Sequence, residues 1–170
     1  MGLSIGVGGV SRAGKTTFSN YITSLYKGKK SLVISMDEYV HDKAKIPRIK
    51  DRIDWETPAS VDYDKIKTKI EESLNEYDLV ITEGILIFYS EEINKLFDKR
   101  VFLDIPKSLF YQRRHSDKRW GEEPKWYIDY VWESYLRYGK LNEAFSDTLY
   151  ISGNDEFSAL TIDEYLFKVG

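Results

Sequence analysis

The sequence of 170 residues contains no cysteine, only four prolines and no long hydrophobic run. Without thiols the chain forms no disulfide, no thiolate zinc site and no cysteine nucleophile, which is compatible with a reducing cytoplasm. No apolar segment approaches the roughly 20 residues that span a bilayer. No targeting leader is recognised at the N-terminus, and Gly6 stands where a myristoylation motif needs Ser or Thr. We therefore expect a cytoplasmic protein without membrane contacts.

An excess of positive charge is also missing. The formal net charge is −3, whereas general nucleic-acid binders are usually strongly basic, so we expect no nucleic-acid partner. The length and the 42% content of hydrophobic residues suit a single domain over residues 1–170 with one full core. The oligomeric state that we expect is a monomer or a homodimer.

One motif stands out among what is present. The residues from Gly9 to Thr16 read GVSRAGKT and fit the phosphate-binding pattern G-x-x-x-x-G-K-[ST], the P-loop. An apolar, strand-like segment at 3–8 precedes it, and a segment at 16–26 with helically spaced apolar residues follows it. This order of strand, glycine loop and helix is the context that a P-loop requires. The alternative, a glycine-rich turn that matches by chance, does not explain the flanking segments.

The chemistry of the loop suits a nucleoside triphosphate with Mg²⁺. Glycines let backbone N–H groups wrap closely around phosphate oxygens, and the start of the following helix adds partial positive charge. Lys15 is a mobile cation for the β- and γ-phosphates, and the hydroxyl of Thr16 is a ligand for Mg²⁺. We therefore expect ATP and Mg²⁺ as cofactors. The residues expected to bind the nucleotide here are Gly9, Ser11, Ala13, Gly14, Lys15, Thr16 and Thr17.

Strand-like and helical segments alternate along the whole chain. Continuous apolar runs are typical of strands that are buried on both faces of a parallel sheet. The alternation predicts an α/β fold, a three-layer α/β/α P-loop domain with a five-stranded parallel sheet and a small lid. The expected strands lie at 3–8, 31–35, 78–82, 100–105 and 148–151, and the expected helices at 16–26, 61–77, 107–118 and 126–145, with a last helix from Thr161, which has capping-box spacing to Glu164.

Two acidic residues follow strand-like segments, so we expect them at the rim of the sheet that carries the P-loop. Asp37 comes after the second strand and is a candidate general base for the proton of an acceptor hydroxyl. Its alternative role is to cap a loop or helix. Glu83 comes after the third strand and is a candidate to hold Mg²⁺ or its water. The alternative for Glu83 is a solvated acid at a strand end.

Two further segments do not fit the scaffold. Residues 39–60 form a long polar segment, the acceptor loop, in which Trp55 and Glu56 offer a stacking surface and a carboxylate. From the residues alone we favour a buried Trp55 that anchors this loop. Residues 112–125, the lid, are rich in charge, and their guanidinium groups match phosphate oxygens. A solvated helix face is an equally good interpretation of this basic cluster, which comprises Arg113, Arg114, Lys118 and Arg119.

Over nearly its whole length the chain resembles the uridine kinase-like branch of P-loop kinases, and most closely nicotinamide riboside kinases. The sequence departs from that pattern in several respects. Glu56 stands where Asp is usual, Gln112 replaces a basic residue of the lid, and Glu38 with Tyr39 matches the usual acidic-aromatic pattern only approximately. The chain is also shorter than typical uridine kinases. The segments that carry the resemblance are IGVGGVSRAGKTT at 5–17, SMDEY at 35–39, WETP at 55–58 with Asp62, ITEG at 81–84, LDIP at 103–106, Arg113 with Arg114, and VWESYL at 131–136.

The resemblance implies an ATP-dependent kinase that phosphorylates a primary hydroxyl of a small, ribose-containing acceptor. The acceptor is ribosylnicotinamide in the first place, with uridine or cytidine next and a sugar phosphate or pantothenate as a more distant alternative. It implies Asp37 as the base, Glu83 near Mg²⁺ and Glu56 at the ribose hydroxyls. Catalytic roles are expected for Asp37, Lys15 and Arg114, nucleotide contacts for Arg113, and acceptor contacts for Asp37, Tyr39, Trp55, Glu56 and Arg114.

Two other classes of protein share a P-loop. A GTPase switch or motor would carry D-x-x-G and N-K-x-D, and neither occurs, since Asn94-Lys95-Leu96-Phe97 fails at its last position. A non-catalytic nucleotide-binding module is disfavoured by the presence of Lys15, Thr16, Asp37 and Glu83 together. Acceptor-dependent release of ADP discriminates a kinase from both.

Overall fold

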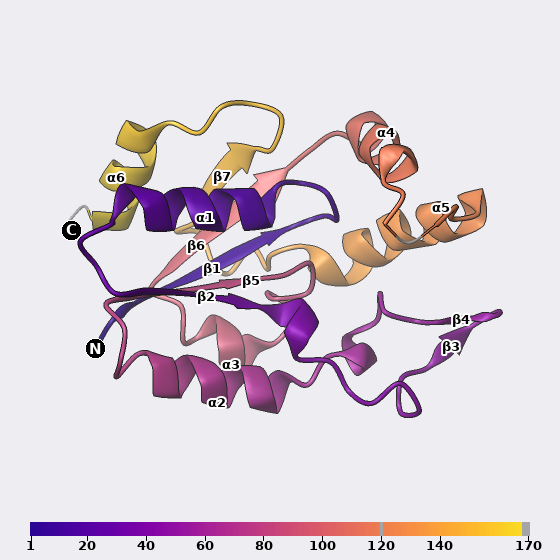
Figure 1. The fold of residues 1–170 in the computed structure, drawn as a ribbon, viewed down its shortest axis with the longest axis horizontal. Coiled ribbons are helices and arrows are strands. Elements are labelled where there is room, and N and C mark those ends of the chain that lie inside the picture. Colours follow the sequence, from indigo (N-terminus) through magenta and orange to yellow (C-terminus); the bar gives the residue numbers. More distant parts are fainter. Residues whose placement is uncertain (120, 168–170) are drawn as a thin grey trace.

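A five-stranded, fully parallel sheet forms the centre of the molecule, as the sequence predicted (Figure 1). The computed structural model describes residues 1–119 and 121–167; Trp120 of the expected lid and residues 168–170 lie outside the described residues. The strand order is β2-β5-β1-β6-β7, with β1 in the middle. The strands are β1 (Leu3–Gly9), β2 (Ser31–Ser35), β5 (Leu79–Glu83), β6 (Lys99–Asp104) and β7 (Leu149–Ser152).

Helices cover both faces of the sheet and give the expected three layers (Figure 1). One face carries α1 (Lys15–Leu25) and α6 (Ala159–Phe167), and the other carries α2 (Tyr63–Ser73) and the short α3 (Glu91–Asn94). Two more helices, α4 (Lys107–Ser116) and α5 (Lys125–Ser134), lie beyond the carboxyl ends of the strands. The small hairpin of β3 (Arg48–Ile49) and β4 (Arg52–Ile53) lies at the same end.

The core lies between these layers. Ile5, Val7 and Ile81 of the sheet are fully buried, as are Phe18 of α1 and Ile66 of α2. The apolar runs that marked the strands in the sequence are therefore sandwiched between helices, which is why they contain hardly any polar residues. A well-packed sheet of this kind is a rigid frame for residues at its rim.

Several helix boundaries differ from the sequence-based expectation. The expected helix at 126–145 ends at Gly139, after a π-helical turn at Tyr135–Gly139; Gly139 packs closely on the chain, since a Cβ there would lie 2.9 Å from the carbonyl oxygen of Ile85. The last helix begins before Thr161, since the hydroxyl of Ser158 accepts a hydrogen bond from the Thr161 amide and caps the first turn.

The observed helix α2 is shorter than the helix that the apolar pattern predicts at 61–77. Asp62 caps it by accepting a hydrogen bond from the Lys65 amide, so that α2 begins at Tyr63. The hairpin β3–β4 and the helix α3 were not predicted, because each is too short to show a periodic pattern.

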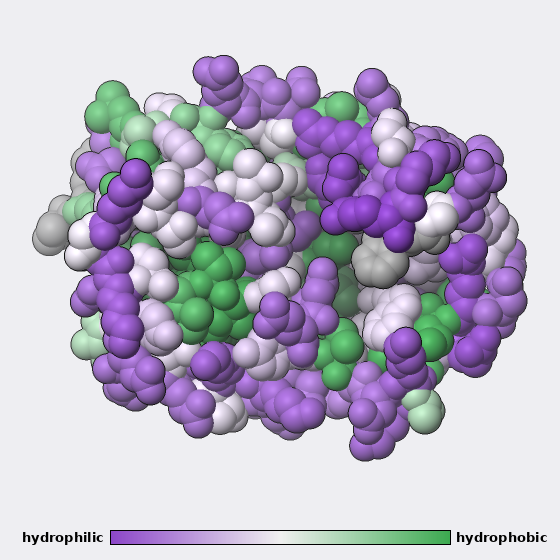
Figure 2. Space-filling model, viewed as in Figure 1, coloured by the Kyte–Doolittle hydropathy of each residue, from purple (hydrophilic) through white to green (hydrophobic). Residues whose placement is uncertain are grey.

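The surface reflects the same arrangement. Figure 2 shows hydrophilic side chains gathered over α4, above a hollow at the place where β1 passes into α1. Apolar surface lies between α1 and α2, where the edge strand β2 runs. Among the described residues, no helix combines the length and the apolar character that a membrane crossing requires.

Candidate active site

The P-loop joins the central strand to α1 and is shaped by two glycines. Gly9 has φ 145°, and a Cβ there would lie 2.4 Å from the carbonyl oxygen of Leu103. Gly14 has φ 98° and stands at the N-cap of α1. Both positions demand glycine, one for space and conformation and the other for its left-handed backbone. The loop therefore brings backbone N–H groups and the positive end of α1 to one place.

Lys15 and Thr16 extend from the start of α1 into this place. The Lys15 ammonium donates a hydrogen bond to the carbonyl oxygen of Val10 at 3.0 Å. Burial lowers the pKa of Lys15, while the nearby carboxyl groups of Glu83, Asp37 and Glu56 oppose that shift. A buried ammonium among carboxyl groups is a cation held ready for an anionic ligand.

Glu83 and Thr16 meet at the end of β5. The hydroxyl of Thr16 lies 3.0 Å from Oε1 of Glu83, which accepts its hydrogen bond. Glu83 is buried rather than solvated, and it pairs in register with Val7 of β1 and Ser35 of β2. Two hard oxygen ligands next to a phosphate cradle fit Mg²⁺, which prefers oxygen and retains several waters. Among the described residues no cluster of three metal-binding side chains occurs, as is usual where phosphates and water complete the magnesium shell.

Asp37 lies in a short 3₁₀ turn, Met36–Glu38, directly after β2. Its exposed carboxylate borders a cavity of about 930 Å³ that also includes Ser11, Glu83 and residues 14–17. The carboxyl ends of β1, β2 and β5 therefore bring the P-loop, Asp37 and Glu83 to one cavity. Gly9 and Ala13 are buried within the loop and shape it from behind.

Part of the cavity comes from a segment that sequence reasoning missed. After β7, the residues Gly153, Asp155, Glu156 and Phe157 line the side opposite Asp37's strand, together with Tyr21 of α1. A Cβ at Gly153 would lie 2.3 Å from the carbonyl oxygen of Ala13, so only glycine permits this approach to the P-loop. The sequence did carry a signal for this segment. It follows the fifth parallel strand, and the carboxyl ends of all strands of such a sheet lie at one rim.

The basic residues of α4 and the following segment divide between two environments. Arg113 borders the cavity and donates to the carbonyl oxygens of Arg12 at 2.8 Å and Gly153 at 3.0 Å. Arg119 also borders the cavity and is chelated by Asp117. Lys118 is exposed. The structure thus places Arg113 and Arg119 at the cavity and Lys118 at the surface, and contact of the arginines with a ligand stays a prediction.

Arg114 is held between Glu123 of the lid and Ser11 of the P-loop. Its guanidinium forms a two-pronged contact with Glu123, at 2.6 and 2.8 Å, and donates to the hydroxyl of Ser11 at 2.7 Å. Both partners of the ion pair are nearly buried. A bidentate pair of this kind fixes geometry strongly. Arg114 therefore connects the lid to the P-loop, and its expected role in catalysis stays a prediction.

In the acceptor loop, the side chain of Glu56 is buried and that of Trp55 is exposed. Trp55 is 37% exposed, so the expectation of a buried anchor is wrong; the neighbours Asp54 and Glu56 are the buried residues. Residues 55 and 56 form a turn after β4, in which the side chain of Glu56 is buried and that of Trp55 is exposed. Tyr39 is half-buried against the core, and its carbonyl oxygen accepts a hydrogen bond from the Asp62 amide.

Glu56 has an unusual protonation equilibrium. Burial raises its pKa from 4.5 to about 7, although the guanidinium of Arg114 opposes this. Three other carboxyl groups raise it further, those of Asp54, Asp37 and Glu123. At neutral pH this carboxyl group is thus poised between its two forms.

Replacing Glu56 by glutamine should make the protein more stable at alkaline pH. In the unfolded chain the carboxyl group ionises near pH 4.5, but in the folded protein only near pH 7. Its ionisation therefore opposes folding increasingly as the pH rises from 4.5 to 7, by about 3 kcal/mol in full. Urea unfolding should show Glu56→Gln gaining about 2–3 kcal/mol over the wild type between pH 5 and pH 8. Glu76→Gln, at an exposed site after α2, should show no such gain; equal pH dependence of all three proteins would contradict the buried-acid interpretation.

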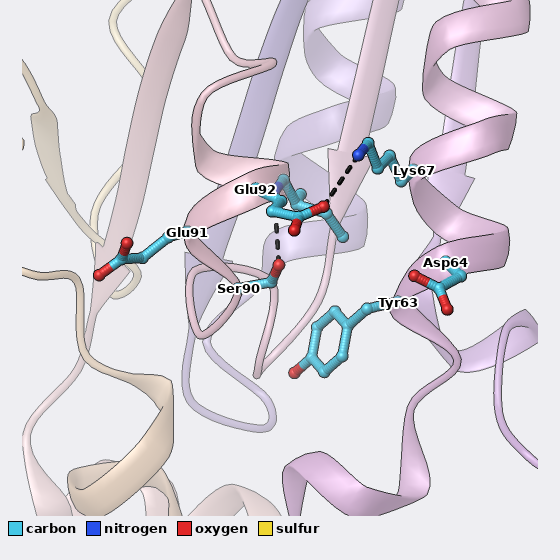
Figure 3. A pocket seen from close by; sticks show the side chains of 7 residues that line it. Tyr63, Asp64, Lys67, Ser90, Glu91 and Glu92 are labelled. Atoms are coloured by element: carbon cyan, nitrogen blue, oxygen red, sulfur yellow. Dashed lines mark hydrogen bonds and ion pairs between the residues drawn. The ribbon is translucent and has the colours of Figure 1, made fainter.

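A second, smaller pocket lies between α2 and α3. It has a volume of about 380 Å³ and is lined by Tyr63, Asp64 and Lys67 of α2 with residues 90–93 (Figure 3). Lys67 points across to Glu92 and pairs with it at 2.8 Å. The described lining therefore offers no unpaired cation for a phosphate, and the pocket shares no residue with the P-loop.

Fold and site together define a P-loop kinase scaffold. The sequence is 25% identical to the nicotinamide riboside kinase of Saccharomyces cerevisiae, in an alignment that covers 77% of this chain and 75% of that protein. It is 24% identical to the uridine kinase of Deinococcus deserti, over 92% of this chain and 90% of that protein. A structure described as a possible uridine kinase from Bacillus stearothermophilus superposes with a TM-score of 0.58 at 19% identity, covering 89% of each chain. No family model matches the sequence.

These findings confirm the resemblance that the motifs indicated. The curated relatives are kinases named for nicotinamide riboside and for uridine, and the structural neighbour shares the fold. The chain is similar to uridine kinase-like P-loop kinases, with a five-stranded parallel sheet as expected.

Proposed function

We propose that this chain is an ATP- and Mg²⁺-dependent kinase that transfers the γ-phosphoryl group to the primary hydroxyl of a nucleoside-like acceptor. The observation that carries this proposal is the cavity in which Lys15, Thr16, Glu83 and Asp37 meet at the carboxyl ends of three neighbouring strands. Ribosylnicotinamide is the first candidate acceptor, because a relative is named for it. Uridine and cytidine follow, since other relatives are named uridine kinase.

The nucleotide end of the cavity has the groups that phosphoryl transfer needs. The loop amides and the Lys15 ammonium bind phosphate oxygens, and Arg113 and Arg119 add positive charge from the opposite wall. Thr16 and Glu83 would hold Mg²⁺, which, when bound, neutralises phosphate charge and orients the phosphates. The protein's own contribution is therefore positioning and charge complementarity.

We assign the acceptor to Asp37, which borders the cavity, and to Glu56, a buried residue outside the cavity's lining whose carboxyl group lies near enough to that of Asp37 for their charges to interact. Asp37 accepts the proton of the attacking hydroxyl, because its carboxylate faces the same cavity as the P-loop. Glu56 receives the vicinal hydroxyls of the ribose, and the exposed ring of Trp55 lies next to it in the chain for contact with the base. A cytoplasmic location and a monomeric or homodimeric state stay predictions.

An acceptor screen tests the proposal. The purified protein is incubated with ATP and Mg²⁺, and release of ADP is measured with nicotinamide riboside, uridine, cytidine, a sugar phosphate and pantothenate. A nucleoside-type kinase releases ADP slowly alone and rapidly with one nucleoside. Stimulation by pantothenate or the sugar phosphate alone would show that the acceptor is not a nucleoside. ATP binding without acceptor-dependent turnover would favour a non-catalytic module.

Ribonucleosides should be phosphorylated roughly 10- to 100-fold more efficiently than their 2′-deoxy analogues, measured as kcat/KM. A buried carboxyl group that has lost its hydroxyl partner is left unpaired, and a hydrogen bond to a charged group is worth about that factor. Glu56→Ala should abolish most of the preference. The control Glu122→Ala removes an exposed carboxylate of the lid and should retain it. Equal rates with both acceptors in the intact enzyme would exclude this role of Glu56.

A further inference from the structure

Three residues of the acceptor loop contact three aromatic residues of α5. The ammonium of Lys50 lies 4.0 Å from the ring centroid of Trp126. The guanidinium of Arg52 lies 5.0 Å from the ring centroid of Tyr127. The carboxylate of Asp54 accepts a hydrogen bond of 2.6 Å from the hydroxyl of Tyr130. We call this set of three pairs the clasp.

The clasp joins the hairpin β3–β4 to one face of α5. Lys50 lies in the turn between β3 and β4, Arg52 lies in β4, and Asp54 directly follows that strand. Trp126 and Tyr127 lie four and three residues before Tyr130, so these rings share one face of α5. Lys50 adopts φ 51°, a left-handed conformation that costs free energy for a residue other than glycine. Lys50 is the first residue of the two-residue turn between β3 and β4, and turns of this length favour positive φ.

Asp54 connects Tyr130 to Glu56 through two hydrogen bonds. One oxygen of its carboxylate accepts from Tyr130, and the other accepts from the backbone amide of Glu56 at 3.1 Å. Asp54 is only 8% exposed, so these bonds compete little with water. Burial and the Asp54 carboxylate raise the pKa of Tyr130 to about 12, and its hydroxyl therefore stays a donor at neutral pH.

The side chain of Glu56 is held from the same helix. The hydroxyl of Tyr127 donates to Oε1 of Glu56 at 3.5 Å, which is a long hydrogen bond. The backbone amide of Glu56 is thus bonded to Asp54, and its side chain is bonded to Tyr127. If the clasp served only to stabilise the fold, none of its residues would need to form a hydrogen bond with Glu56, the residue assigned to the acceptor.

We propose that Tyr130 is a positioning residue for the acceptor, acting through Asp54 on the backbone of Glu56. This inference rests on the proposed function, because Glu56 is the group assigned to the acceptor's hydroxyls. Helix α5 thereby determines where the ribose is held, although Tyr130 itself is separated from Glu56 by Asp54.

The first test removes only the hydroxyl, in Tyr130→Phe. The KM for the ribonucleoside should rise about tenfold, and the preference over the 2′-deoxy analogue should fall by a similar factor, since a hydrogen bond to a carboxylate is worth about that much. The KM for ATP should change by less than about twofold, because the P-loop is not part of the clasp. The matched control is Tyr111→Phe, which removes a hydroxyl that bonds to Asp129 of the same helix away from the loop. It should leave both KM values and the preference unchanged.

A double-mutant cycle separates positioning from general stability. If Tyr130 acts through Glu56, Tyr130→Phe should have no further effect on acceptor preference in the Glu56→Ala background. Additive effects in the cycle would overturn the proposal. So would an equal rise of the KM for ATP, or the same loss of preference in Tyr111→Phe.

Amide hydrogen exchange supplies a readout that needs no activity. In Tyr130→Phe, exchange at residues 48–56 should accelerate about tenfold, with the Glu56 amide included, while α1 and the P-loop stay unchanged. Unchanged exchange would overturn the positioning role whatever the acceptor. Accelerated exchange in a protein that phosphorylates no nucleoside would instead refute the proposed function, and the acceptor role of Tyr130 with it, while the link between Tyr130 and Glu56 would stand.

Discussion

Lys15→Ala should fold like the wild type and lose about 10³-fold of its phosphoryl-transfer rate. The ammonium lies among loop amides and carboxyl groups at the start of α1, where it is nearly buried. Preorganised donors and cations at a transferring phosphoryl group are typically worth a factor of about 10² to 10³ each. Single-turnover rates with ATP and the best acceptor from the screen measure the loss.

The fold should survive the substitution because burial of the charged ammonium opposes folding. Burial lowers the pKa of Lys15, which means that the folded protein disfavours its charge, and the helix contact of this residue is made by its backbone oxygen with Ser19. Lys15→Met retains the length of the side chain without its charge and should lose the same activity. Lys27→Ala, at an exposed site after α1, should retain it. Wild-type turnover of Lys15→Ala with any acceptor would refute the P-loop assignment.

The sheet and the P-loop could be predicted from the sequence because their signals are local. A strand buried on both faces must be apolar throughout, as in residues 79–81, and the glycines at 9 and 14 are required by backbone conformations. The rim positions of Asp37 and Glu83 followed from one rule, that parallel strands end at one edge. These features need no knowledge of which distant residues touch.

The remaining parts of the site depend on contacts between distant residues, which leave no periodic signal. The bidentate pair of Arg114 with Glu123 joins a residue of α4 to one in the segment after it, and no periodic pattern in the sequence marks it. The approach of Gly153 to Ala13 joins residues 140 positions apart. The exposed Trp55 was mistaken for an anchor because a large aromatic side chain is usually buried. These positions depend on packing against other elements of the fold, which the local sequence does not specify.

Asp37→Asn should lower turnover about 10²-fold or more while the affinity for ATP changes little. The substitution preserves shape and size, but an amide oxygen accepts no proton at neutral pH, so the attacking hydroxyl loses its base. The carboxylate is exposed at the wall of the cavity, in the turn after β2, so the exchange of one oxygen for NH₂ leaves the core untouched. The turnover number and the dissociation constant of ATP, measured on the same preparation, separate the two effects.

The neighbouring residue Glu38 provides the matched control. Its carboxylate is also exposed and occupies the same 3₁₀ turn, so Glu38→Gln removes an equal charge one residue away. A base at Asp37 predicts a large loss in Asp37→Asn and a change of less than about threefold in Glu38→Gln, because general-base catalysis depends on contact with the reacting proton rather than on net charge. Unchanged turnover in Asp37→Asn would reduce Asp37 to a structural role in its turn. Loss of ATP binding would assign it to the metal or to folding, and the base would then have to be sought among the carboxyl groups of the acceptor loop, with Glu56 first because its pKa of about 7 suits proton transfer at neutral pH.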